Sequence, residues 1–181
     1  MIRSYRLLGA LMLAAAPSVA AQAPAGGAPQ PGAEVKKLQF FVGRWTSTGD
    51  MKASPMGPGG AMRVTNNCEW FPGGFHVVCR SEGTTPMGAT QGLGIISYNP
   101  ERKQYAYYSI DNSGMPPDPV RGSLSGDTWL WEGEGMMGGQ TIKGRYTMKT
   151  VSPDEYSWTW EMQMPGQSWT MVATGSDKRV K

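Results

Sequence analysis

The side chains in this sequence that could do chemistry are two cysteines, one histidine and a glycine-rich run. The run Gly133-Glu134-Gly135-Met136-Met137-Gly138 has the GxGxxG spacing that binds a dinucleotide pyrophosphate when a helix follows it. Residues 141–149 instead alternate between apolar and polar side chains, which predicts a strand. We therefore interpret the run as a glycine-rich hairpin loop and expect no nucleotide cofactor.

The other candidate sites are equally incomplete. His76 is the only histidine, too few for a zinc site, and no Gly-x-Ser-x-Gly motif accompanies it. Met162 and Met164 would point the same way on a strand and suit Cu(I), but methionine also fills cores and nothing completes a soft site. No inward pair of carboxylates suits acid–base catalysis. We expect no metal or other cofactor, and an enzymatic role is disfavoured.

Cys68 and Cys79 flank Phe71-Pro72-Gly73-Gly74-Phe75, a strong turn signal. A turn centred on Gly73-Gly74 puts the two cysteines opposite each other across a hairpin, within reach of a disulfide. The export predicted below favours the bridge over a pair of buried free thiols. If Cys79 points inward, His76 has the opposite parity and points outward, which argues against haem ligation.

The N-terminus has the pattern of a secretory signal peptide over residues 1–20. Arg3 and Arg6 precede the apolar run 7–16, and small residues at 18 and 20 suit cleavage between Ala20 and Ala21. The run is shorter than the roughly 20 apolar residues of a membrane span. We expect a periplasmic or secreted protein that does not span a membrane after cleavage.

The rest of the chain is predicted to consist of a linker and one domain. Residues 21–32, rich in Ala, Pro and Gly, are expected to be a flexible linker, and residues 33–181 a single domain. Removing Arg3 and Arg6 lowers the formal net charge from +3 to +1, so the basic pI gives no reason to expect nucleic acid as a partner. Residues 178–181 are interpreted as a solvated end.

One short helix is predicted for residues 34–41, with Gly43 as the signal that ends it. In the rest of the domain, apolar and polar side chains alternate with period two, the pattern of strands. The predicted strands are 44–52, 61–70, 75–84, 89–98, 103–110, 118–125, 127–133, 139–149, 155–164 and 168–175. Such a series, with hairpin-length connections, predicts an all-β antiparallel up-and-down meander that closes into a barrel. A two-sheet sandwich is the alternative.

The segment from Leu38 to Thr46, LQFFVGRWT, resembles the start of lipocalin-like (calycin-type) barrels, where a short helix precedes Gly-x-Trp on the first strand. Residues 92–99, 103–111 and 158–162 are similar to an uncharacterised domain-of-unknown-function family of exported bacterial proteins with such barrels. The resemblance covers most of 36–176 and implies the fold, but no activity. Haem-binding relatives of this fold carry their ligand near the C-terminus, where this chain has no histidine. Trp45 is expected to close the barrel floor, which is compatible with a ligand above it.

The alternation gives each strand an aromatic and methionine-rich face, expected inside, and a charged face, expected in water. Trp169 and Met171 are expected to continue the inner set. For residues 103–110 the inward face stays open between Tyr107 and Tyr108. The candidate cavity-lining residues are Trp45, Tyr98, Tyr105, Tyr107, Trp129, Trp131, Trp158, Trp160 and Met162.

The leading hypothesis from the sequence is a barrel that binds a small apolar or amphipathic molecule. The alternatives are a filled barrel that serves as a cell-envelope scaffold or interaction module and, third, an enzyme or a metal or haem protein. A cavity of roughly 300 Å³ or more would favour ligand binding, and a packed interior would argue against it.

Overall fold

The computed structural model describes residues 28–54, 57–114 and 118–181. The predicted signal peptide, its cleavage point and most of the predicted linker lie outside the described residues. Pro31–Lys181 form one compact unit.

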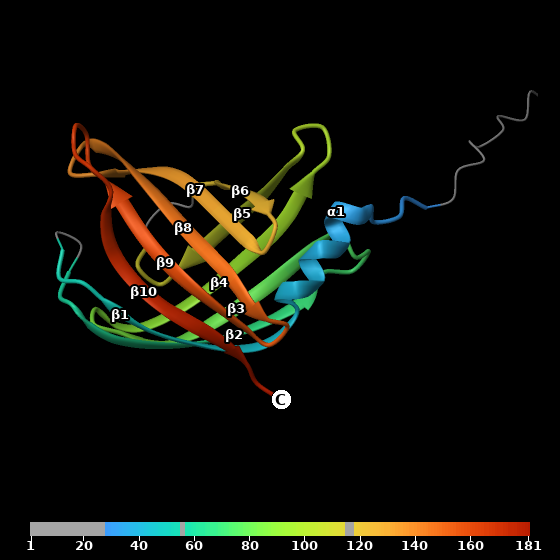
Figure 1. The fold of residues 1–181 in the computed structure, drawn as a ribbon, viewed down its shortest axis with the longest axis horizontal. Helices are drawn as coiled ribbons and strands as arrows, with labels where there is room; N and C mark the ends of the chain where they lie inside the picture. Colours follow the sequence, from blue (N-terminus) through green and yellow to red (C-terminus); the bar gives the residue numbers. More distant parts are fainter. Residues whose placement is uncertain (1–27, 55–56, 115–117) are drawn as a thin grey trace, which may run out of the picture. The chain divides into compact units, whose positions relative to one another are not determined.

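Ten antiparallel strands close into a barrel (Figure 1). Each strand pairs with its neighbours in sequence, and β1 pairs with β10 to complete the ring. The predicted all-β up-and-down barrel is confirmed, and the sandwich alternative is wrong. The strands are β1 (Gly43–Met51), β2 (Gly60–Trp70), β3 (His76–Thr85), β4 (Gly88–Asn99), β5 (Gln104–Asp111), β6 (Val120–Ser125), β7 (Thr128–Met137), β8 (Gln140–Ser152), β9 (Glu155–Gln163) and β10 (Thr170–Arg179).

The glycine-rich run is mostly strand rather than loop. β7 continues to Met137, and only Gly138 and Gly139 form the turn, with positive φ values of 56° and 79°. Such φ values favour glycine, because other side chains are strained there. The interpretation of the whole run as a hairpin loop is therefore wrong for its first five residues, and β8 rather than a helix follows it.

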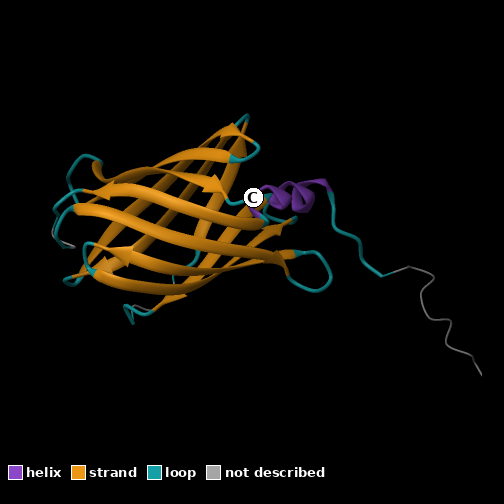
Figure 2. Cartoon of the chain, turned by 90° about the horizontal axis from the view of Figure 1, so that it is seen from below, coloured by secondary structure: helices purple, strands orange, loops and turns teal. Residues whose placement is uncertain are grey.

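Two short helices cover one end of the barrel, which we call the closed end (Figure 2). The α-helix α1 (Ala33–Lys36) continues into the 3₁₀ helix η1 (Lys37–Phe41), where one helix was predicted. Val35, Leu38 and Phe41 are buried at intervals of three residues, the repeat of a 3₁₀ helix. β1 starts at this end, directly after η1, and runs to the opposite end, which we call the open end.

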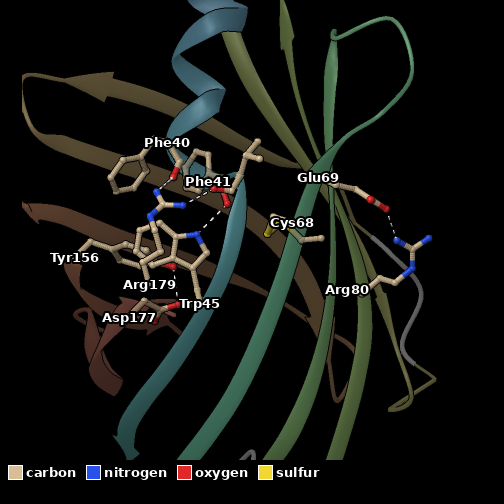
Figure 3. Close-up of a disulfide and its surroundings, with 11 residues drawn as sticks. Phe40, Phe41, Trp45, Cys68, Glu69, Arg80, Tyr156, Asp177 and Arg179 are labelled. Atoms are coloured by element: carbon tan, nitrogen blue, oxygen red, sulfur yellow. Dashed lines mark hydrogen bonds and ion pairs between the residues drawn. A yellow bond between two sulfur atoms is a disulfide. The ribbon is translucent and has the colours of Figure 1, made fainter. Parts of the chain in front are cut away.

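Arg179 ties the C-terminal strand to this helical segment. Its guanidinium donates to the main-chain oxygens of Phe40 and Val42 and lies 4.2 Å from the centre of the Trp45 ring (Figure 3). The Trp45 indole donates to the Phe41 oxygen at 2.9 Å. Trp45 lies at the floor of the barrel, as expected. The interpretation of residues 178–181 as a solvated end is wrong for Arg179, which belongs to β10 and faces inward, while Lys178, Val180 and Lys181 are exposed.

The hairpin of β2 and β3 has the predicted register. Cys68 lies opposite Cys79 and a disulfide joins them. Gly73 and Gly74 form the turn, with positive φ values of 96° and 73°. His76 is exposed, as the parity of the strand predicted.

The apolar pattern of β10 is misleading because of an irregularity between Met171 and Ala173. A bulge of this kind shifts the side-chain parity of a strand. Val172 and Ala173 are therefore both buried, while Met171 is 39% exposed. Trp169 lies beneath the Arg145 guanidinium, which is 4.3 Å from its ring centre. Because Arg145 faces outward, the prediction that Trp169 and Met171 continue the inner set is wrong.

Replacing Arg179 by methionine is expected to lower the free energy of unfolding by about 3 kcal/mol. The change leaves the main-chain oxygens of Phe40, Val42 and Pro153 without their charged donor. It also breaks the ion pair with Asp154 and removes the contact with Trp45. The matched control is Lys178→Met on the outer face, expected to change stability by less than about 0.5 kcal/mol. Urea unfolding followed by tryptophan fluorescence measures both. Equal stability of the two variants would contradict the role given to Arg179.

Candidate functional site

Aromatic side chains fill the half of the barrel next to the closed end. Trp129 and Trp131 stack with ring planes 6° apart, and Phe41 lies edge-on to Trp129 at 5.0 Å. Tyr105 packs against Trp129 at 4.8 Å and against Tyr98 at 4.9 Å. These rings and Trp45 belong to one hydrophobic core. The predicted candidates Trp45, Tyr98, Tyr105, Trp129 and Trp131 thus contribute to this packed layer.

Tyr105 also fixes the helical segment by a polar contact. Its hydroxyl donates to a Glu34 carboxylate oxygen at 2.7 Å. Burial and the adjacent Glu34 carboxylate raise the pKa of Tyr105, so the phenol remains a protonated donor. The same hydrogen bond, together with the one from Lys37, lowers the pKa of Glu34. This arrangement positions α1 against the barrel.

A cavity of about 200 Å³ lies in the other half of the barrel, toward the open end. Its wall comes from β1, β2, β3, β8, β9, β10 and the turn after β3, so it is enclosed from several sides of the ring. The lining residues are Ser47, Met51, Met62, Thr85, Met87, Tyr146, Trp158, Trp160 and Ala173. The volume is smaller than the 300 Å³ or more expected of a typical ligand site, but the interior is not packed throughout.

Among the predicted candidates, Trp158 and Trp160 line this cavity. Met162 is buried and follows Trp160 on the same face of β9. Tyr107 faces inward, since its ring packs against Trp131 at 6.1 Å, while Tyr108 is exposed on the outer face. The pattern therefore found two lining aromatics, but it did not single out Ser47, Tyr146 or the methionines around them.

Glycines on the inner face explain why side chains pack closely against some parts of the barrel wall and leave space beside others. A Cβ atom at Gly49 or Gly175 would lie 2.8 or 2.5 Å from the Trp158 ring, so these glycines let the indole lie flat against β1 and β10. A Cβ atom at Gly144 would meet only the Trp160 Nε1 atom, at 3.8 Å. The space beside Gly144 is therefore open.

A buried carboxylate lies directly behind the cavity wall. Asp177, 2% exposed, accepts hydrogen bonds from the Tyr156 hydroxyl at 2.6 Å and the Trp158 indole at 2.8 Å. The side chains of Ser47 and Asn66 bond to it as well. Burial raises the pKa of Asp177 above its ordinary value, and these four hydrogen bonds oppose that rise.

Asp177 was not among the predicted site residues, because the last strand was predicted to end at residue 175. Continuing the inner parity from Ala173 through Gly175 would have placed Asp177 inside the barrel. Two other acidic residues of the strands behave differently. Glu155 forms an exposed ion pair with Lys178, and Asp111 lies at the end of β5 near the open end.

A second hollow, of about 760 Å³, lies on the outer face of the barrel over β2–β5. Its apolar residues are Trp70, Phe71, Pro72, Val78, Leu93, Ile95 and Tyr108, and His76 and Arg80 lie among them. The expectation of a charged outer face is wrong for this part of the wall. Phe71 is 53% and Tyr108 46% exposed, so a small molecule there would stay largely in water. The inner cavity is the better site for a small ligand.

Two further observations concern the described residues only. Residues 28–54, 57–114 and 118–181 include no group of three or more His, Cys, Asp or Glu side chains placed to hold a metal ion. Within the same ranges, no helix has the length and apolar character needed to cross a membrane.

Comparison with known proteins gives a family and a fold. A family model described as "Protein of unknown function (DUF1579)" matches residues 30–179, and a search of curated proteins finds no match. The structure is similar to that of Rv2717c from M. tuberculosis, with a TM-score of 0.59, 14% identity, and 83% of this chain and 99% of that chain covered. It is also similar to the S-type phycobiliprotein lyase CPES from Guillardia theta, with a TM-score of 0.51, 10% identity, and 81% and 92% coverage. At these identities the likeness shows the fold alone.

The substitution Asp177→Asn is expected to change the pH dependence of stability. Since burial raises the pKa of Asp177 in the folded protein, the unfolded chain ionises first as pH rises above the ordinary value of 3.8. The stability that the carboxyl group contributes is thus full below that value and is lost as pH rises through the folded pKa.

Urea unfolding between about pH 3.5 and pH 7 measures this effect. The stability of the wild type relative to Asp177→Asn should fall as pH rises. Asp50→Asn, at an exposed position on the outer face of β1, controls for the loss of one carboxyl group. A difference that instead grows with pH would mean that the four hydrogen bonds outweigh burial.

Proposed function

We propose that this chain, which belongs to the DUF1579 family of proteins of unknown function, binds a small, mainly apolar molecule at the open end of its barrel. The observation that carries the proposal is the lining of the inner cavity. Aromatic and thioether side chains from strands far apart in sequence converge there, with a few polar groups among them. Ligand sites commonly have this composition, an apolar wall with a small number of placed polar groups.

The volume of the inner cavity limits the size of the ligand that it can hold. A cavity of about 200 Å³ suits a molecule of one or two rings rather than a long lipid or a haem. Methionine side chains adapt their shape easily, so Met51, Met62 and Met87 allow ligands of somewhat different outline.

Two hydroxyl groups give the cavity its polar contacts. Ser47 and Tyr146 line it from β1 and β8. Burial raises the pKa of Tyr146 well above its ordinary value, so its hydroxyl stays neutral and is available as a donor. A ligand with one polar substituent on an apolar ring would use such groups to fix its orientation.

We also propose that the protein works outside the cytoplasm, in the periplasm or after secretion. The pattern of residues 1–20 supports this, and the Cys68–Cys79 disulfide suits an oxidising compartment. N-terminal sequencing of the protein from cell fractions tests it. We expect a mature chain that begins at Ala21 in the periplasmic or extracellular fraction. An uncleaved chain in the cytoplasm would contradict the proposal.

The outer hollow favours a second candidate function, a module that binds another protein. Exposed apolar side chains gathered on one side of a barrel are typical of an interaction surface. The two functions require different residues. Substitutions at Gly144 should affect only binding in the inner cavity, and substitutions at Ile95 or Tyr108 only the outer surface.

The variant Gly144→Val tests the leading proposal. Gly144 has no positive φ, and its Cβ atom would have open space on the inner face, 3.8 Å from the Nε1 atom of the cavity-lining Trp160, so valine fits the strand and narrows the space beside that ring. Native mass spectrometry of wild-type protein from its own host is expected to show a bound molecule of low mass. Gly144→Val is expected to lose it while keeping a thermal unfolding midpoint at or above that of the wild type.

Thr147→Val is the matched control, because it introduces the same side chain into the same strand on the outer face. It should retain the bound molecule. Retention by Gly144→Val, or absence of a bound molecule from the wild type, would count against binding in this cavity.

A further inference from the structure

We infer that the inner cavity selects its ligand by charge: it takes uncharged or cationic ring-sized molecules and rejects carboxylates and other anions. This inference rests on the proposed function, since it concerns the same cavity. It depends on the position of one carboxylate, on the inward-facing basic residues, and on the groups at the open end.

Asp177 is separated from the ligand space by single side chains. Ser47 and Trp158 both line the cavity, and both are hydrogen-bonded to the Asp177 carboxylate. With four partners, the carboxylate has its acceptor positions filled, and it stays in place when a ligand enters. An anion in the cavity would therefore lie close to a fixed carboxylate in a poorly hydrated interior, where like charges repel strongly.

No basic side chain among the described residues is placed to neutralise such an anion. Arg179 is the basic residue that faces inward, and it lies at the closed end with Phe40, Val42 and Trp45 as partners. Lysines and arginines within the other described strand positions have the outward parity; Arg63, Lys143 and Arg145 are examples. A desolvated carboxylate without a paired cation is costly, so the cavity lacks what a fatty acid or other anion would need.

The charged groups at the open end are mostly acidic and also disfavour an anion, but one basic residue lies among them. Asp111 lies near the inner face there, since a Cβ atom at Gly92 would be 3.5 Å from its side chain. Asp118 approaches Gly135 in the same way, at 3.7 Å. Lys52 follows β1 at this end, so the field at the entrance is mixed. The selectivity therefore comes mainly from Asp177.

Neutral and cationic ligands are not repelled by the Asp177 carboxylate. The Ser47 hydroxyl, which donates toward Asp177, keeps oxygen lone pairs that can accept from a ligand N–H or O–H group. The ring of Trp160, which lines the cavity, can receive a cation over its face. The predicted ligand is thus an aromatic or alicyclic ring with an alcohol, amide or amine substituent.

Three probes of nearly equal size test the inference: 3-phenylpropionamide, 3-phenylpropylamine and 3-phenylpropionate. Calorimetric titration of the full mature chain at pH 8 is expected to show binding of the amide and the amine. The carboxylate should bind at least about tenfold more weakly than the amide, as like charges at short range require. In Asp177→Asn the ratio of the amide and carboxylate affinities should fall toward one, while Asp50→Asn leaves it unchanged.

The outcomes separate the two proposals. If the carboxylate binds the wild type as tightly as the amide, the charge inference is wrong, and the cavity remains a binding site. If none of the three probes binds, or if Gly144→Val binds the amide as well as the wild type does, the proposed function fails. The comparison of amide and carboxylate needs only wild-type protein, so it decides the inference even if Asp177→Asn does not fold.

Discussion

The barrel depends on the junction at which Arg179 meets the residues just before β1. Its guanidinium contacts Phe40, Val42 and Trp45, which joins the last strand to the helical segment and to the first strand. β1 and β10 close the ring at the same place. With that end fixed, Phe41 packs against the stacked Trp129 and Trp131, and half of the interior is filled. The cavity exists because the other half lacks such a layer, in a ten-stranded ring wide enough to leave space.

Polar groups divide the interior between structure and recognition. The Tyr105 hydroxyl donates a hydrogen bond to Glu34 at the closed end, and the Tyr156 hydroxyl donates one to Asp177 in the middle of the wall. Ser47 and Tyr146 face the ligand space. In the proposed function, the carboxylate that orders Trp158 and Ser47 also gives the cavity its charge preference. The proposed selectivity then arises from a residue that supports the lining rather than from one that touches the ligand.

The sequence predicted the meander, the disulfide and the outward His76, because hairpin register and period two are local properties that turns reveal. It failed where a tertiary effect overrides the local pattern. The irregularity after Met171 reverses the parity of β10, and the assumption of a short strand hid both Asp177 and Arg179. The size of the cavity could also not be predicted from the sequence. It depends on which residues from strands far apart in sequence meet inside the barrel, as Trp158 does with Gly49 and Gly175.

The closure of the ring has a consequence for how the chain folds. Val42 and Arg179 meet although they are 137 residues apart in sequence, and β1 has no partner on that side until β10 is present. Contacts of such high contact order form slowly, because the loop entropy is lost before the contact contributes. The hairpin of β2 and β3 can form early, but the barrel is complete only after the C-terminus has been synthesised. A chain that folds last at its two ends stays unfolded longer during synthesis, which suits a protein that must be threaded through a membrane, as the proposed export requires.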